Sequence, residues 1–502
     1  MYSRLCLLII FLIVVAGLSL SGAPAPPAAA AAGTTYTVTS TSCTGPGSIT
    51  EAMALANANP GEDTITFTKD LRIDATTCPD VPENSQQNWI LNATESVTFE
   101  GNGAELIGSM LWINSAGDVS PLNRCPSESK GDIIPSVTPG FIKVGVTGSD
   151  NADITVTVRD LDLQELDRVA RIDKNASLIL EDMAMNRIFP ISFRCSGGAV
   201  LALEGANFTA IRTEWTFILQ LEKEDDPGTY LAAITSFGVT GSGNLTIQDS
   251  YFNRVIKQGT IFWNGQPGSE VNIVSSRFDE SDGIYIQGSS RTKIVNTIWT
   301  SVDQGPQKRL INQSSEPMDI VASTILFGDV RCDSTCQFYG SLGWIFRAPG
   351  AGKINFLQSA IGVNIPDSGP VVHSKLLDPS TTDGFSADVY TWVQPTKEQD
   401  ANALKGVTSQ PALLTAVPAF RQVVLNPIYT QSYWATPLSD AEFIDIVPMA
   451  ACGQNNQLLN PIDGSCITED ALGNNRVDAN GARTSGAVQL ALAPDLTVTG
   501  TG

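Results

Sequence analysis

The chain has almost no histidine and few basic residues. Among its 502 residues there is one histidine, His373, and 30 Lys and Arg stand against 52 Asp and Glu. A Ser-His-Asp or Cys-His arrangement could use only that histidine, and no nucleophile elbow, phosphate-binding glycine loop or dinucleotide fingerprint is present. The net charge of −22 argues against nucleic acid and anionic membranes, whose recognition needs basic patches. We therefore expect no nucleic-acid partner.

Long apolar runs are confined to the N-terminus. Arg4 precedes an apolar run from Leu5 to about Leu20, and small residues and an Ala/Pro tract follow. This order is typical of a secretory signal peptide, so residues 1–32 are expected to be a signal peptide with its Ala/Pro tract. No later segment is apolar for long enough to span a bilayer. The chain is thus predicted to be secreted or displayed at a cell surface, with no transmembrane span after signal removal.

Eight cysteines follow the expected signal peptide, and an even number in an exported chain predicts disulfides. Zinc is disfavoured because there is no Cys-x-x-Cys pair and only one histidine, so no metal site is expected. Proximity along the chain suggests four pairs, namely Cys43–Cys78, Cys332–Cys336, Cys452–Cys466 and, as the remaining pair, Cys125–Cys195.

A short phrase recurs through the middle of the chain. Two apolar residues alternate with polar ones, a small or polar turn residue follows, and a bulky apolar residue comes two or three positions later, as in Leu245–Phe252 and Val271–Phe278. The turn residues lie mostly about 20 to 30 residues apart, a period typical of solenoids. They are Asp160, Asp182, Gly205, Asp249, Ser275, Asn296, Ala322 and Gln358.

Alternation with a period of two dominates each copy, which indicates strands rather than a helical repeat. A single copy cannot bury its apolar face, but copies stacked at about 4.8 Å per coil form one continuous core. We therefore predict an all-β fold, a right-handed parallel β-helix.

A short helix is expected before the first coils. Ser48 is placed to cap it, and Glu51 three residues later completes a capping box. The helix is predicted over Ile49–Asn57 and ends before Pro60-Gly61. Laid across the first coil, it would cover a sheet edge that otherwise invites pairing with another chain.

Both ends of the chain resemble one protein family. The stretches Cys43–Ala52, Ala56–Gly61 and Asp63–Ile65 look like the N-terminal signature of bacterial exported β-helix surface proteins, which runs Cys-Ser-Leu-Arg-Glu-Ala and then Pro-Gly-x-Asp-Thr-Ile. This chain has Ile49-Thr50 in place of Leu-Arg. Residues 470–488 resemble the closing segment of the same family. The resemblance implies a surface-associated or secreted, pectate-lyase-like β-helix and no particular activity.

The predicted organisation has three parts after the signal peptide. Residues 33–96 are expected to form an N-terminal cap, 97–376 the β-helix and 377–502 the C-terminal coils and cap. Loop insertions are predicted at about 111–150 and 213–240 within the β-helix. The wide gap between Gly205 and Asp249 is interpreted as a doubled coil that contains the second insertion.

Residues at equal offsets from the turn residue should stack on one flank of a solenoid. Five positions past it, Arg187 and Arg254 are equivalent, although about three coils apart, and Glu280 shares the offset between Asp279 and Asp282. Arg254, Asp279 and Glu280 are therefore candidate catalytic residues, and Arg187 and Asp282 candidate binding residues, of an acidic-sugar site. Turn residues that form surface ion pairs are the competing interpretation.

The absence of a dense catalytic cluster favours a non-enzymatic role in structure, adhesion or glycan binding. The partner would be an extracellular polysaccharide or a cell-envelope component. The rival hypothesis is a polysaccharide lyase or glycoside hydrolase acting on extracellular acidic polysaccharide. A carbohydrate-binding role through exposed aromatic residues such as Trp263 or Trp299 is a third, although Trp299 sits at a core-like position of the repeat. No cofactor is required, and Ca²⁺ is compatible with the carboxylates.

Overall fold

The computed structural model describes one long body and a set of short strands near it. Several predicted features lie outside the described residues. They are the signal peptide expected at the N-terminus, the turn residue Gln358, the closing segment 470–488, His373, Glu280, Asp282, Cys125, Cys195, Cys452 and Cys466. The described residues are 33–78, 89–108, 112–113, 119–120, 140–188, 198–218, 232–236, 240–255, 259–279, 281, 283–300, 309–339, 342–347, 353–357, 360–361, 385–387, 392–393, 412–413, 420–421 and 436–437.

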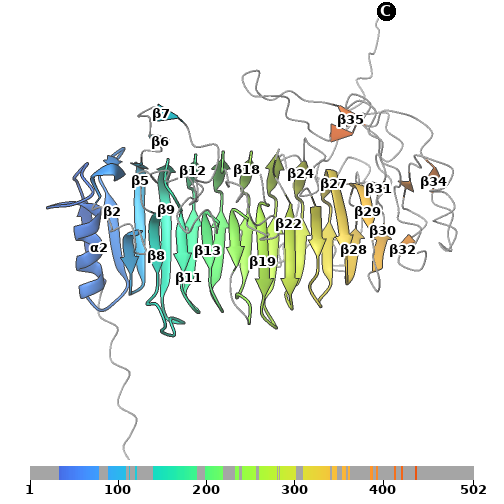
Figure 1. Ribbon diagram of the computed structural model, residues 1–502, viewed down its shortest axis with the longest axis horizontal. Helices are drawn as coiled ribbons and strands as arrows, with labels where there is room; N and C mark the ends of the chain where they lie inside the picture. Colours follow the sequence, from blue (N-terminus) through green and yellow to red (C-terminus); the bar gives the residue numbers. More distant parts are fainter. Residues whose placement is uncertain are drawn as a thin grey trace, which may run out of the picture.

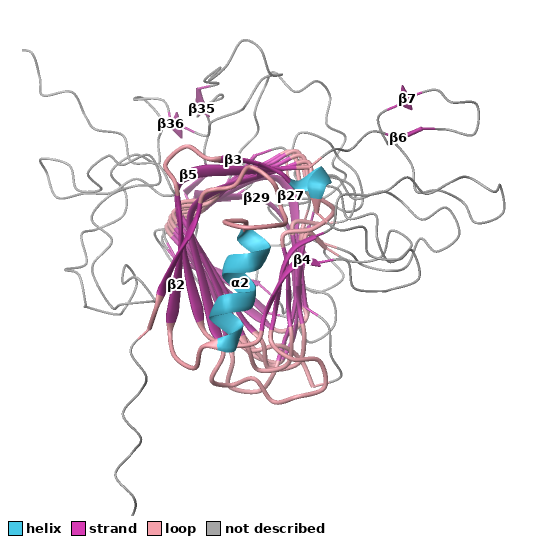
Figure 2. Ribbon diagram, turned by 90° about the vertical axis from the view of Figure 1, so that its left-hand side faces the viewer, coloured by secondary structure: helices cyan, strands magenta, loops and turns pink. Residues whose placement is uncertain are grey.

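The body is a parallel β-helix, as the repeat predicts (Figure 1). Seen from its N-terminal end, each coil has three sides, which carry β2, β3 and β4 in the first coils (Figure 2). We call these sides face A, face B and face C. Strands on each side pair in parallel with those of the next coil.

Face A contains β1 (Thr35–Val38), β2 (Asp63–Phe67), the first halves of β5 (Val97–Ile107) and β9 (Thr155–Gln164), β11 (Ser177–Glu181), β14 (Asn207–Ile211), β17 (Leu245–Gln248), β20 (Glu270–Val274), β23 (Arg291–Val295), β26 (Met318–Val321), β28 (Thr335–Tyr339), β30 (Lys353–Leu357) and β32 (Phe385–Ala387). Face B contains β3 (Arg72–Asp74), the second halves of β5 and β9, β12 (Ala184–Asn186), β15 (Glu214–Thr216), β18 (Tyr251–Asn253), β21 (Arg277–Asp279), β24 (Ile298–Thr300), the first halves of β27 (Thr324–Cys332) and β29 (Leu342–Arg347), β31 (Ala360–Ile361), β33 (Trp392–Val393) and β34 (Ala412–Leu413). Face C contains β4 (Trp89–Ala93), β8 (Gly140–Val144), β10 (Ala170–Ile172), β13 (Val200–Ala202), β16 (Ile234–Ser236), β19 (Ile261–Gly265), β22 (Ile284–Gly288), β25 (Arg309–Asn312) and the second halves of β27 and β29. Two small antiparallel pairs complete the described strands, β6 (Trp112–Ile113) with β7 (Val119–Ser120) and β35 (Phe420–Arg421) with β36 (Thr436–Pro437).

Alternation along the strands explains where the core lies. In β2 and β11, every second side chain is buried and the intervening ones are partly exposed. Because coils pair in register, buried residues form columns along the axis, for example Phe99, Val158 and Leu180. The columns make one continuous apolar core, which no single coil could form.

Most of the predicted turn residues lie at the corner between faces A and B, as the repeat predicts. Six of the predicted turn residues have left-handed backbone, with φ between 46° and 53°, a conformation that Asp and Asn tolerate better than most residues. The prediction of Gly205 is wrong, because Arg212 (φ 50°) occupies this corner and Gly205 belongs to the turn before β14. Hence a single step, and not a doubled coil, separates Arg212 from Asp249.

Strands occupy part of each predicted loop, and the β-helix begins earlier along the chain than residue 97, where it was predicted to begin. Strand β8 lies inside the first expected loop and is buried on face C, and β15 and β16 lie inside the second. Strands β1 and β2, expected in the cap, already pair as coils. Strands β8, β15 and β16 lack the long alternation that marks most of the others, so they could not be recognised from the sequence alone.

Helix α2 (Ile49–Ala58) lies across the N-terminal end of the coils, as expected (Figure 2). The Ser48 hydroxyl accepts from the Glu51 amide, and the Glu51 carboxylate accepts from the Gly47 amide. Two of the expected disulfides are present, Cys43–Cys78 beside the short 3₁₀ helix η1 (Ala75–Thr77), and Cys332–Cys336. No helix in the described part of the chain is long and apolar enough to cross a membrane.

Two buried ladders line the interior next to the A–B corner. One consists of aromatic rings: Phe252 stacks on Trp215 at 5.6 Å and on Phe278 at 4.6 Å between centroids. The other consists of hydroxyl side chains that each bond to main chain or to the next hydroxyl. Its members are Thr213, Ser250, Ser276, Thr297 and Ser323.

Candidate functional site

The corner between faces B and C holds the arginines predicted to share one flank. Glu165, Arg187, Phe217 and Arg254 follow strands that pair in register, and their φ angles lie between 54° and 56°. The equivalence of Arg187 and Arg254 is therefore confirmed. They lie two coil-to-coil steps apart and not three, because Phe217 occupies the one equivalent position between them.

Contacts along this corner join neighbouring coils. Arg187 Nη1 lies 3.0 Å from Glu165 Oε1. The Arg254 guanidinium lies 5.1 Å from the centroid of the Phe217 ring, within the range of a cation–π interaction. The row thus runs carboxylate, guanidinium, aromatic ring, guanidinium along the axis. The two arginines point their charge at different partners and do not converge on one point.

Asp279, a candidate catalytic residue, ends β21 and is only 1% exposed. Its Oδ2 accepts a hydrogen bond from the Tyr251 hydroxyl at 3.2 Å, and it forms an ion pair with Arg277 on its own strand. The Arg277 guanidinium also lies 5.0 Å from the centre of the Tyr251 ring. The backbone amide of Arg254 donates to the Asp279 carbonyl, which ties this group to the corner row.

Burial raises the pKa of the Tyr251 hydroxyl, and the negative charge of Asp279 raises it further. The phenol therefore stays protonated at neutral pH and serves as a donor. Tyr251 and Arg277 both contact Oδ2 of Asp279. A catalytic acid or base would have to present such an oxygen to a substrate. The arrangement suits a group that ties two coils together.

An acidic group on face B was missed from the sequence. Burial raises the pKa of Asp162, and the negative charges of Glu105, Asp160 and Glu214 raise it further. Asp162 and Glu214 each lie two positions after a turn residue, Asp160 and Arg212 respectively. Their equivalence could therefore have been inferred from the sequence if Arg212 had been recognised as a turn residue. Among the residues that the structure describes, no group of three or more His, Cys, Asp or Glu could hold a metal ion.

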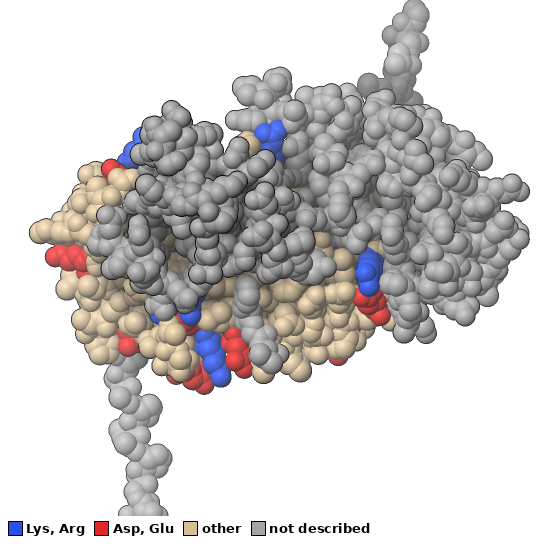
Figure 3. All heavy atoms as spheres, viewed as in Figure 1, with Lys and Arg blue, Asp and Glu red and all other residues tan. Residues whose placement is uncertain are grey.

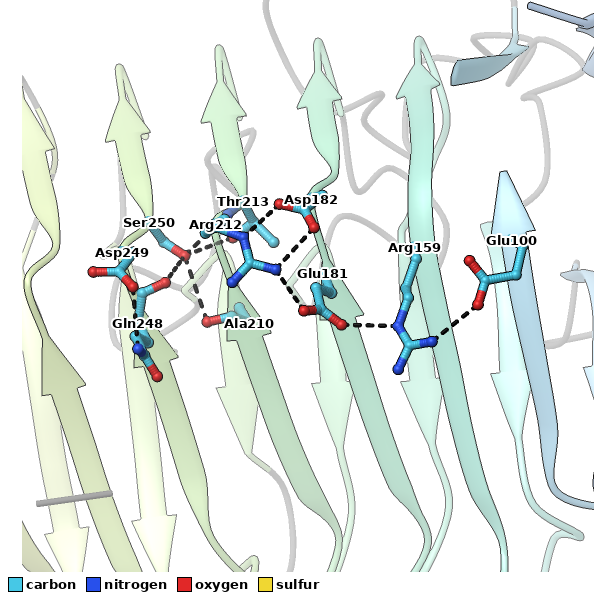
Figure 4. A network of polar contacts seen from close by, with 10 residues as sticks. All are labelled: Glu100, Arg159, Glu181, Asp182, Ala210, Arg212, Thr213, Gln248, Asp249 and Ser250. Atoms are coloured by element: carbon cyan, nitrogen blue, oxygen red, sulfur yellow. Dashed lines mark hydrogen bonds and ion pairs between the residues drawn. The ribbon is translucent and has the colours of Figure 1, made fainter. Parts of the chain in front are cut away.

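The A–B corner carries an ion-pair ladder over four coils (Figure 4). Arg159 joins Glu100 at 2.9 Å and Glu181 at 2.8 Å, and Arg212 joins Glu181 and Asp182. Hydrogen bonds from Arg212 lower the pKa of both Glu181 and Asp182. These pairs are largely exposed, so each contributes only about 0.2–1 kcal/mol.

Charge elsewhere on the surface follows the same pattern. In the view of Figure 3, most Lys and Arg side chains of the described residues lie beside Asp or Glu. On face C, Lys143 and Arg171 both contact the buried Asp173 carboxylate, at 3.4 and 2.7 Å. Many of the charged side chains of the described residues are therefore paired with a side chain of opposite charge.

The two tryptophans considered for sugar stacking are buried. Trp263 is 0% exposed and donates to the Gly243 carbonyl, and Trp299 is 2% exposed and donates to the Ser281 carbonyl. Both side chains point into the core because they occupy inward positions of the alternation. The hypothesis that they bind carbohydrate as exposed aromatic residues is therefore wrong, and the core-like position of Trp299 is confirmed.

Comparison with known proteins adds no assignment. No family model matches the chain, and neither a curated protein nor a solved structure matches it.

Proposed function

We propose that the chain is a secreted or cell-surface β-helix that acts as a structural or adhesive element and binds an extracellular polysaccharide or a cell-envelope component. In this proposal it is a relative of the bacterial exported β-helix surface proteins that its two ends resemble, and it has no catalytic activity. The signal-like N-terminus and the acidic net charge of −22 are compatible with work outside a cell.

One observation carries the proposal. The candidate groups that the structure describes are engaged with other residues of the chain: Arg187 with Glu165, Arg254 with Phe217, and Asp279 with its two neighbours on face B. An enzyme that cuts polysaccharides needs two carboxylates facing a bond, or a metal-held uronate beside a base. Inter-coil pairs instead stiffen a scaffold, which favours the non-catalytic role.

The test is an incubation of the purified chain with a panel of polysaccharides, including uronate-rich ones, with and without Ca²⁺. Unsaturated product and new reducing ends would be followed together, and binding to insoluble fractions would be measured in parallel. We expect binding without turnover. Turnover that disappears in Asp279→Asn or Arg254→Ala but persists in Arg159→Ala, on the opposite corner, would overturn the proposal in favour of a lyase or hydrolase.

A further inference from the structure

The outer surface of face A carries a straight row of threonines, one from almost every coil. Register places them directly opposite one another from β1 to β17, with Ile179 as the one interruption, and each side chain is at least partly exposed. At about 4.8 Å per coil, the row spans roughly 30 Å. Its members are Thr35, Thr64, Thr98, Thr157, Thr209 and Thr246.

These hydroxyl groups do not stabilise the described part of the protein through hydrogen bonds. None of the six makes a side-chain hydrogen bond to another described residue, whereas the interior hydroxyl ladder is bonded throughout. β-Branched side chains suit an exposed strand, and valine would serve that purpose equally. The outer hydroxyls are therefore available to a ligand along the whole row.

The next position of the row provides a second and independent observation. Asn272 pairs in register with Thr246 and is only 6% exposed, and its Oδ1 is buried without a hydrogen-bond partner. Its amide nitrogen donates to Glu270 at 3.3 Å. A buried acceptor without a donor reduces stability, and such groups in native proteins call for an explanation. A hydroxyl group from outside the protein would satisfy this oxygen once the side chain turned outward, because the atom is covered in the structure.

The surroundings of the row indicate an uncharged ligand. From Thr35 to Asn272 the row carries no charge, and in the ladder beside it two arginines offset all but one of the three carboxylates. The net charge of −22 repels polyanions. Up to residue 308, the gaps in the description longer than three residues all fall between a face B strand and the next face C strand, so they do not interrupt face A.

We propose that this threonine row and Asn272 bind an uncharged polysaccharide chain lying along the axis of the β-helix. The threonine hydroxyls would exchange hydrogen bonds with sugar hydroxyls, and Asn272 Oδ1 would accept one of them. This inference rests on the proposed glycan-binding role and specifies its ligand class and its face.

The test measures retention of the full chain on microcrystalline cellulose, chitin and insoluble β-glucan, with immobilised polygalacturonate as the acidic comparison. We expect retention on at least one neutral glycan. The triple variant Thr98→Val, Thr157→Val, Thr209→Val should weaken it about tenfold or more, because three hydroxyl groups are lost while side-chain shape is kept. Thr216→Val, on face B, is the matched control and should bind normally.

Asn272→Ala separates a ligand role from a structural one. It should weaken retention while changing thermal stability little, because the removed oxygen has no partner and only the long 3.3 Å bond from the amide nitrogen to Glu270 is lost. Unchanged retention in the triple variant, or no retention of the wild type on any neutral glycan, would overturn the inference. Retention on polygalacturonate or on isolated cell envelope alone would also overturn it, yet would leave the broader proposed function standing.

Discussion

The aromatic ladder provides the sharpest test of how the coils hold together. Phe252 is fully buried and stacks on a ring from the coil on either side. Replacing it by alanine removes both contacts and leaves a cavity that neighbours fixed in register cannot fill. Phe→Ala changes in cores cost about 3–5 kcal/mol, and two lost ring pairs place Phe252→Ala in the upper part of that range. Phe252→Leu keeps most of the volume and should cost about 1–2 kcal/mol.

Urea unfolding followed by circular dichroism would measure these differences, at constant slope m if the transition is unchanged. Leu55→Ala is the control, because Leu55 is 47% exposed on α2 and its loss should change stability by less than about 0.5 kcal/mol. Hydrogen exchange should show the damage concentrated in the coils that flank Phe252, since each coil contacts only its neighbours. An alanine variant no less stable than the leucine variant would refute the stacking argument.

Two further predictions concern the charged corner and the disulfides. Arg212→Gln should lower stability by about 0.5–1 kcal/mol at neutral pH. Its carboxylate partners have lowered pKa values in the folded chain, so the difference from wild type should hold above about pH 4 and vanish as the pH falls further; a pH-independent difference would contradict this. Removing Cys43–Cys78, whose partners are 35 residues apart, should destabilise by about 3–4 kcal/mol, against about 2 for Cys332–Cys336 with a separation of 4; thermal melts of the paired Cys→Ser variants would rank them, and the reverse order would refute the loop-entropy account.

The fold was predictable because two local signals agree along the chain. Alternation marked the strands, and Asp, Asn or Ser at the A–B corner marked the turns, where these residues tolerate left-handed backbone. Arg212 escaped because arginine carries no turn signal, and only pairing with the neighbouring coils places it at the corner. The same misassignment displaced the second loop boundary and suggested a coil that does not exist.

The candidate site was only partly predictable, for reasons of register and packing. Counting from the turn residue correctly aligned Arg187 with Arg254, because the strands between the A–B turn and these residues have the same length and pair in register. The threonine row was hidden, since Thr98 and Thr157 are register partners across a long insertion. Nothing in the sequence reveals that Asn272 is buried with an unpartnered oxygen, because its burial depends on neighbours from other coils.

Main-chain hydrogen bonds between coils run parallel to the long axis of the body, since the strands lie across it (Figure 1). Tension applied along that axis would therefore stretch the hydrogen bonds between two neighbouring coils along their own direction. It would not shear many strands past one another. Under such a pull the coils would detach singly, each release lengthening the tether while the remaining coils stay folded. A β-helix anchored at one end and attached to a surface at the other would then behave as an extensible shock absorber.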